Sequence, residues 1–209
     1  MFDVEQWLEA GGIALLAAIV FAESGLFFGA FLPGDTLLFI AGFLSSSAGN
    51  EVLPALPITA GVVFVAAVAG DQVGYAFGRR VGPALFQRPN SRLFHPKNAV
   101  RAQEFFDQRG PAAIVIARFI PIVRTFTPIV AGVGHMHYRT FLAYNLIGGA
   151  LWGIGVTTLG YFLGEIEFVK ENLDYAAVMI LVVSLAPIAM EYRRSRRAAA
   201  TKAAAATEG

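Results

Sequence analysis

The sequence predicts an all-α polytopic membrane protein. We expect two inverted repeats, each made of an amphipathic helix, a re-entrant hairpin and a transmembrane helix, followed by one C-terminal transmembrane helix. Three observations carry this prediction. Of the 209 residues, 56% are hydrophobic and 15% are charged, whereas an ordinary globular domain carries about 25% charged residues. The apolar residues lie in long stretches, and two of these stretches are interrupted by proline. The interrupted stretches share the same order of flanking features.

Three apolar stretches are long enough to cross a bilayer, which takes roughly 20 residues. They are residues 58–78, 140–163 and 174–191. We expect each of them to form a transmembrane helix.

Two further apolar stretches, 12–44 and 111–134, contain residues that break helices. The breaks are Pro33 and Gly34 in the first stretch, and Pro121 and Pro128 in the second. Proline removes a backbone donor and kinks or ends a helix. A membrane tolerates broken backbone only where protein buries it or where it lines a wet cavity. Each stretch is therefore predicted to be a re-entrant hairpin of two half-length helices.

The two hairpins have matching neighbours in the sequence. Each follows a short amphipathic segment, ends in Ala-Gly and precedes a span that ends in Gly-Tyr-x-x-Gly. We therefore expect a single membrane domain over residues 1–192 and a basic, disordered tail over 193–209. Within the domain, the predicted parts are a first repeat at about 1–82, a second at about 96–165 and a final span at 174–191.

Counting crossings predicts the topology. A hairpin returns to its own side and a span crosses, so the second repeat runs inverted, as in many transporters. The basic segments 79–110 and 193–209 then lie on one side, which the positive-inside rule places in the cytoplasm. We expect a multi-pass protein of the cell membrane with a cytoplasmic C-terminus. One alternative stays open, because residues 12–31 are long enough to cross outright and would then place the N-terminus inside.

Four charged residues interrupt the predicted hairpins: Glu23, Asp35, Arg118 and Arg124. A charge at the bilayer centre costs roughly 2.5–3.5 kcal/mol on insertion scales, so such groups usually pair or face a cavity. Hairpins that enter from opposite faces would bring the two acids and the two arginines together. The planar fork of arginine suits a phosphate monoester. We expect the arginines to bind phosphate and the acids to carry protons.

A structural alternative is that the two acids neutralise the two arginines as ion pairs that lock the hairpins. Asp71 lies within the first span. It is expected either to pair with Arg79 or Arg80 or to contact the site as an accessory residue.

Three segments carry a resemblance to a known family: "FLPGD" at 31–35, "GDQVGYAFGRRVG" at 70–82 and "ARFIPIVRTFTPIVAGVGHMHYRTFLAYNLIGGALW" at 117–152. With Glu23, they resemble the DedA family, also called the SNARE-associated or VTT-domain family, over roughly residues 12–165. The resemblance implies that the motif acids and arginines are required for function, and Asn145, Gly148 and Trp152 fit the same motif. It also implies lipid translocation, either of undecaprenyl phosphate or of phospholipids, often coupled to protons.

Other functions are less well supported by the residues. The chain has no cysteine and three histidines without a His-Glu-x-x-His pattern, so we expect no metal site and no cofactor. We expect no nucleic-acid partner, and a homo-oligomer is compatible with the sequence. We expect a transporter rather than an enzyme. Two alternatives stay open: a proton-coupled exporter of small cations or drugs, and, less favoured, a membrane lipid phosphatase, which would need a nucleophile or a catalytic histidine beside the arginines.

Glycines recur at short spacings in both central spans. We expect them to form small-residue faces for close helix packing rather than ligand contacts. The two series are Gly70, Gly74, Gly78 and Gly82, and Gly148, Gly149, Gly153 and Gly155.

Overall fold

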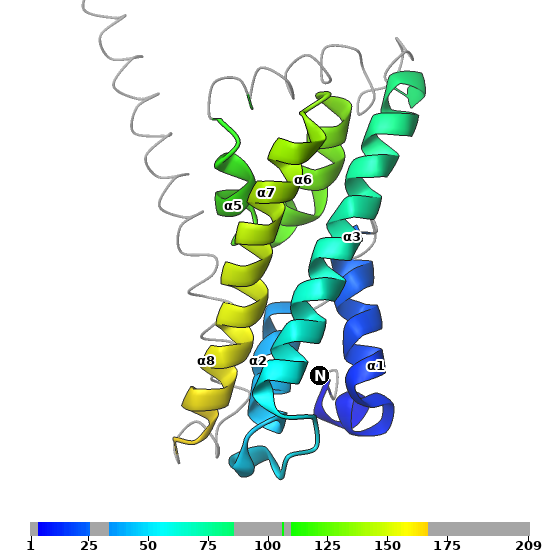
Figure 1. Ribbon diagram of the computed structural model, residues 1–209. Helices are drawn as coiled ribbons and strands as arrows, with labels where there is room; N and C mark the ends of the chain where they lie inside the picture. The colour runs from blue at the N-terminus through cyan, green and yellow to red at the C-terminus, as the bar shows by residue number, and fades with distance from the viewer. Residues whose placement is uncertain (1–3, 26–33, 86–105, 107–109, 167–209) are drawn as a thin grey trace, which may run out of the picture.

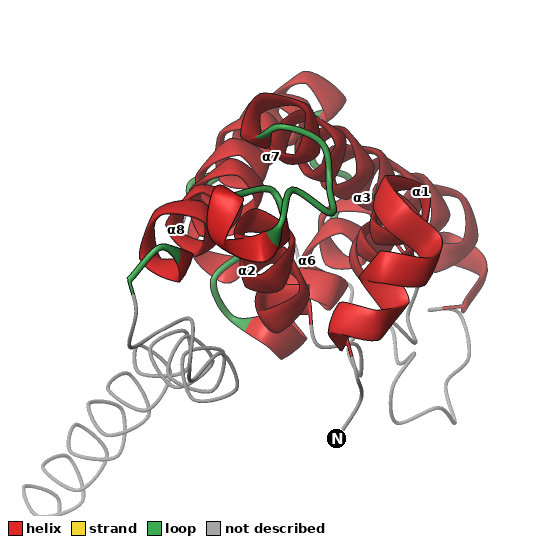
Figure 2. Ribbon diagram, turned by 90° about the horizontal axis from the view of Figure 1, so that it is seen from below, coloured by secondary structure: helices red, strands yellow, loops and turns green. Residues whose placement is uncertain are grey.

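The computed structural model describes residues 4–25, 34–85, 106 and 110–166 (Figure 1). The regular secondary structure of this part of the chain is entirely helical (Figure 2), which confirms the predicted all-α class for the residues described. The elements are α1 (Val4–Gly25), α2 (Gly34–Leu44), the 3₁₀ turn η2 (Ser47–Gly49), α3 (Leu56–Leu85), α5 (Ala113–Ala117), α6 (Pro121–Val133), α7 (Tyr138–Gly149), the π-helix η3 (Ala150–Ile154) and α8 (Gly155–Gly164).

Two long helices run the length of the described structure (Figure 1). One is α3, and the other is the continuous series α7, η3 and α8. Each contains an apolar segment of 27 residues, Leu56–Gly82 and Tyr138–Gly164. A helix of that length measures about 40 Å and exceeds the roughly 30 Å of the hydrocarbon core. The spans predicted from 58–78 and 140–163 are therefore present as helices of sufficient length. The third span, 174–191, and the tail 193–209 lie outside the described residues.

The first broken stretch forms α1 and α2, which lie together in the lower half of Figure 1. Gly12 has φ 55° and ψ −154° and kinks α1, a conformation that is essentially restricted to glycine. After the kink, the apolar part of α1 ends at Gly25, and α2 begins at Gly34. These two helices measure about 22 Å and about 17 Å, so neither alone spans the hydrocarbon core. The predicted break at Gly34 coincides with the start of α2.

Pro33 lies outside the described residues. So do residues 26–31 of the alternative in which 12–31 cross as one helix.

The second broken stretch forms α5 and α6, which lie in the upper half of Figure 1. The chain leaves the helical path between α5 and α6, and α6 begins at Pro121, the position at which the sequence predicts a break. The break predicted at Pro128 is wrong, because this residue lies inside α6. Proline cannot donate to the Arg124 carbonyl, but its ring packs against α3, where a Cβ on Gly74 would lie 3.2 Å from the Pro128 Cβ.

The described residues form two apolar clusters, a lower and an upper one in the view of Figure 1. In the lower one, buried residues of α1, α2 and α3 pack together with Trp152. In the upper one, Tyr75 of α3 packs with residues of α5, α6 and α7, and its ring stacks on Phe141 with centroids 4.4 Å apart. Each broken stretch is thus fixed against α3 by its own cluster.

Glycines allow the broken helices to touch the long helices backbone to backbone. A Cβ added at Gly160 of α8 would meet the Phe39 carbonyl of α2. A Cβ added at Gly42 of α2 would meet the backbone of Thr157 of α8. Likewise, a Cβ added at Gly78 of α3 would meet the Ile129 carbonyl of α6. A Cβ added at Gly132 of α6 would meet the Tyr75 carbonyl of α3. α2 with α8 and α3 with α6 are consequently among the most extensive helix pairs in the described structure.

The packing role predicted for the glycine series is confirmed at most positions. Close neighbours surround the first series, Gly70, Gly74, Gly78 and Gly82, and also Gly148, Gly149 and Gly153 of the second. The prediction is wrong for Gly155, where a Cβ would meet no atom within 4 Å. Gly155 begins α8 directly after the π-helix, and its Cα faces away from the neighbouring helices.

We expect Gly160→Ala to destabilise the protein and Gly155→Ala to leave it unchanged or slightly more stable. The methyl group at 160 would force α8 away from α2, and overpacking of this kind costs about 1–3 kcal/mol. At 155 the same change adds helix propensity, worth up to about 1 kcal/mol, without a clash. Thermal unfolding of the two detergent-purified variants measures this. Equal unfolding midpoints would contradict the packing described for α2 and α8.

Candidate functional site

Five charged side chains are buried together at the level where the two broken stretches meet. They come from α1 (Glu23), α2 (Asp35), α3 (Asp71), the end of α5 (Arg118) and α6 (Arg124), and their exposed fractions lie between 1% and 8%. An isolated buried charge is very costly, so buried charges are found paired and hydrogen-bonded. The five groups are held as two linked ion-pair clusters.

Arg124 forms the first cluster and connects the two broken stretches. Its Nη1 donates to Asp35 Oδ1 at 2.6 Å, and its Nη2 donates to Glu23 Oε1. The carboxylates come from α1 and α2 of the first stretch, whereas the guanidinium comes from α6 of the second. One planar side chain therefore binds both acids, as the fork of arginine allows.

Arg118 forms the second cluster. Its Nη1 donates to Asp71 and also to Asn145 Oδ1 at 2.7 Å. Asn145 in turn donates from Nδ2 to the Val68 carbonyl at 3.3 Å. The guanidinium is thus held against α3 and α7 by two side chains.

Asp71 therefore contacts the site rather than pairing with a basic residue at the end of α3. Arg79 donates instead to the Tyr75 hydroxyl at 2.8 Å and to the Met136 carbonyl at 3.4 Å. The observed pairing also differs from the structural alternative with one acid for each arginine, because Arg124 takes both hairpin acids and Arg118 takes Asp71.

Trp152 links the two clusters, and reasoning from the sequence did not assign it this position. Its Nε1 donates to Asp35 Oδ1 at 2.7 Å. Its ring lies 4.4 Å from Arg124 Cζ and 5.6 Å from Arg118 Cζ, distances suited to cation–π attraction. Trp152 is 2% exposed and sits in the π-helix η3; single π-turns inside α-helices occur frequently at functional sites. The sequence does contain a signal for this contact. Trp152 lies in the same motif segment as the two arginines, and a buried indole N–H usually finds an acceptor.

Three polar atoms of the clusters have no hydrogen-bond partner within the part of the chain that the structure describes. Arg118 Nε, Arg118 Nη2 and Glu23 Oε2 are buried and hydrogen-bond to nothing in the described part of the chain. Nε and Nη2 form one edge of the guanidinium, the edge that binds two oxygens of a carboxylate or phosphate. Within the described residues, Arg118 thus has two unused hydrogen-bond donors and Glu23 one unused acceptor.

The charge balance of the clusters also bears on their chemistry. Three carboxylates face two guanidinium groups, so one negative charge is in excess when all five are ionised. Binding one proton would neutralise the site, and a second proton would make it attractive to an anion.

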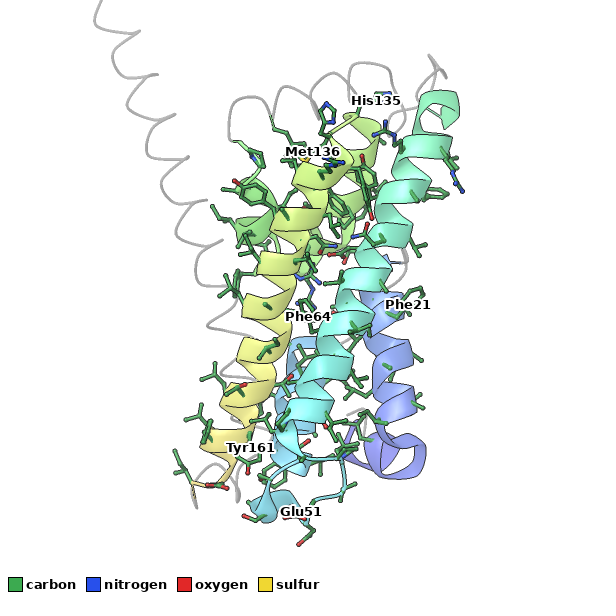
Figure 3. All side chains as sticks on the ribbon, viewed as in Figure 1. Phe21, Glu51, Phe64, His135, Met136 and Tyr161 are labelled. Atoms are coloured by element: carbon green, nitrogen blue, oxygen red, sulfur yellow. The ribbon has the colours of Figure 1, made fainter. Side chains whose placement is uncertain are left out.

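The described residues contain no group of three or more histidine or acidic residues arranged to hold a metal ion. His135 and His137 lie in and beside the turn between α6 and α7, and Figure 3 labels His135 at the upper end of the molecule, away from the charged clusters.

Comparison with known proteins gives a consistent result over most of the chain. The profile of the VTT domain matches residues 32–162. Protein DedA of Escherichia coli (strain K12) is 45% identical over 190 residues, which cover 91% of this chain and 86% of that protein. An uncharacterized membrane protein of Mycobacterium tuberculosis (strain ATCC 25618 / H37Rv) is 44% identical over 208 residues, covering 95% and 88%. Inner membrane protein YghB of Escherichia coli (strain K12) is 33% identical over 172 residues, covering 82% and 77%. No solved structure matches the chain.

Proposed function

Because the chain belongs to the VTT-domain family of membrane proteins, also called the DedA family, we propose that it is a lipid translocase. It moves a phosphate-bearing lipid, either undecaprenyl phosphate or a phospholipid, across the cytoplasmic membrane and couples this movement to protons. It acts as a transporter rather than an enzyme. The observation that carries the proposal is the buried Nε and Nη2 edge of Arg118, which has no hydrogen-bond partner among the described residues.

The packing of the two halves supports the inverted-repeat architecture that such transport needs. α2 presents Phe39 and Gly42 to α8, and α6 presents Ile129 and Gly132 to α3, at the same three-residue spacing. Gly160 of α8 faces the Phe39 carbonyl, and Gly78 of α3 faces the Ile129 carbonyl in the same way. The two stretches then enter the membrane as hairpins from opposite sides, and broken helices of inverted repeats meet near the midplane in many transporters.

The orientation in the membrane follows from the positive-inside rule. The end of α3 that carries Arg79 and Arg80, where the α6–α7 turn also lies, faces the cytoplasm. The opposite end, where Figure 3 labels Glu51 and Tyr161, faces outward. The C-terminus is then cytoplasmic.

Phosphate recognition occurs at the level of the two clusters. A phosphate oxyanion binds the free edge of Arg118 through two parallel charge-assisted hydrogen bonds. Asp71 and Asn145 hold the other side of the guanidinium and keep this edge pointing toward the ligand. Arg124 becomes available to the same phosphate when its carboxylate partners are protonated.

Proton coupling follows from the excess of carboxylates. A neutral carboxyl at Glu23 or Asp35 binds Arg124 more weakly than a carboxylate does, which frees the guanidinium for the phosphate. In the proposed cycle, protons from outside reach Glu23 and Asp35, the lipid phosphate engages Arg118 and Arg124, the hairpins rock, and the protons leave inside. Arg124 thus exchanges its carboxylate partners for the lipid phosphate.

Reconstitution in liposomes tests the proposal. We expect wild-type protein to move NBD-labelled phosphatidylglycerol, read by dithionite quenching, or undecaprenyl phosphate, read by its accessibility to added soluble phosphatase. Release of free phosphate by the protein itself would point to a lipid phosphatase instead. Proton flux evoked by added cations, without lipid movement, would point to an exporter.

We expect Arg118→Lys to lower the translocation rate about 10–100-fold, because lysine keeps the charge beside Asp71 but lacks the planar edge for two phosphate oxygens. Arg139→Lys, an exposed change on α7, is the matched control and should transport at the wild-type rate. An Arg118→Lys variant that folds and transports normally would contradict phosphate binding at this edge.

We expect external acidification to accelerate lipid movement by the wild-type protein, because protonation of the hairpin acids releases Arg124. Glu23→Gln removes one of these proton acceptors while Asp35 still holds Arg124, so its transport rate should lose much of its dependence on pH. The same liposome assay, run in mildly acidic and mildly alkaline buffers, measures this. Proton coupling through Glu23 is wrong if the variant keeps the wild-type rate and the wild-type pH dependence.

A further inference from the structure

A polar pocket opens at the Arg79 end of α3, apart from the buried clusters. Its volume is about 730 Å³, and its polar lining comes from α3 and the start of α7: Gln72, Tyr75, Arg79, Arg80, His137 and Tyr138. Met136, which bonds to this lining, is labelled at the upper end of the molecule in Figure 3. Among the described residues, none of those that line the pocket is acidic.

The pocket is positively charged, and one of its arginines is held in place. Arg79 and Arg80 are both exposed, and neither pairs with a carboxylate within the described residues. Arg79 Nη1 donates to the Tyr75 hydroxyl and to the Met136 carbonyl, and that hydroxyl donates to the same carbonyl at 2.5 Å. These bonds position the guanidinium at the pocket without neutralising its charge.

The lining of the pocket includes an amide that has no hydrogen-bond partner among the described residues. Both polar atoms of the Gln72 side chain are buried, and neither hydrogen-bonds to any described residue. A buried polar group without a partner costs about 1–3 kcal/mol, so this amide is suited to a ligand that enters the pocket.

The pocket and the second cluster use neighbouring residues of α3. Gln72 directly follows Asp71, the carboxylate bound to Arg118. Arg79 lies about 10 Å further along α3. The two arginines therefore lie about two helical turns along α3 from Asp71, the carboxylate bound to Arg118.

We propose that this pocket is a second phosphate-binding site, a vestibule that receives the headgroup of a phosphate-bearing lipid at the cytoplasmic end of the protein. The inference rests on the proposed lipid translocation, which it deepens by adding a headgroup site on the path to Arg118. Arg79 and Arg80 supply the charge, and Gln72 supplies a donor at the inner end.

Binding measured without transport tests the vestibule. Detergent-purified full-length protein is titrated by calorimetry with farnesyl phosphate, a short-chain lipid phosphate, and separately with inorganic phosphate. Because Arg118 offers another phosphate site, the measurements are made in an Arg118→Lys background. We expect farnesyl phosphate to bind the Arg118→Lys protein. Adding Arg80→Gln or Gln72→Leu to this background should weaken that binding about tenfold, a change equal to about 1.4 kcal/mol.

Arg139→Gln is the matched control, since Arg139 is exposed on α7 but does not line the pocket; it should bind like the parent. Unchanged binding in Arg80→Gln and Gln72→Leu would overturn the vestibule. Equal affinity for inorganic and farnesyl phosphate would overturn the lipid headgroup as its ligand. The proposed function fails separately: a protein that binds farnesyl phosphate through Arg80 but moves no lipid in liposomes keeps the site and loses the translocase.

Discussion

The binding of Arg124 to Glu23 and Asp35 is the interaction on which the described structure depends. It joins residues 101 and 89 positions apart in the chain and ties α6 to both helices of the first broken stretch. All three side chains are buried, and removing one partner from a buried ion pair costs about 3–5 kcal/mol, because it leaves a charge uncompensated. Helices too short to cross a membrane alone are thereby fixed at the centre of the fold.

This arrangement also explains why the other polar groups lie where they do. Trp152 adds a hydrogen bond to Asp35 and places its ring beside both arginines, so the clusters share one wall. Asp71 and Asn145 hold Arg118 on one side, and its other edge has no partner in the described residues. Both arginines are thus paired with carboxylates, Arg124 with two and Arg118 with one. The proposed phosphate transport relies on this asymmetry.

Hydropathy was sufficient to predict the all-α class and the two long helices, because apolar length decides whether a helix can span. The cost of charge in an apolar segment likewise singled out Glu23, Asp35, Arg118 and Arg124. Which arginine pairs with which acid could not be predicted, because the pairing depends on how each helix is rotated about its axis. The observed rotation brings Arg118 next to Asp71. Pro128 failed as a break since packing on Gly74 offsets the missing hydrogen bond. The role of Trp152 depends on a π-turn that has no clear sequence signature.

Stability of charge-neutral variants tests the central claim, that Arg124 joins the two broken stretches through two carboxylates. Thermal unfolding of detergent-purified protein is compared for Arg124→Gln and for the triple variant Glu23→Gln, Asp35→Asn, Arg124→Gln. The account predicts a loss of about 3–5 kcal/mol for Arg124→Gln, which strands two buried carboxylates. It also predicts that the triple variant recovers most of this loss, because no unpaired charge is left at Arg124's site. A wild-type midpoint for Arg124→Gln, or a triple variant at least as unstable as that single change, would contradict it.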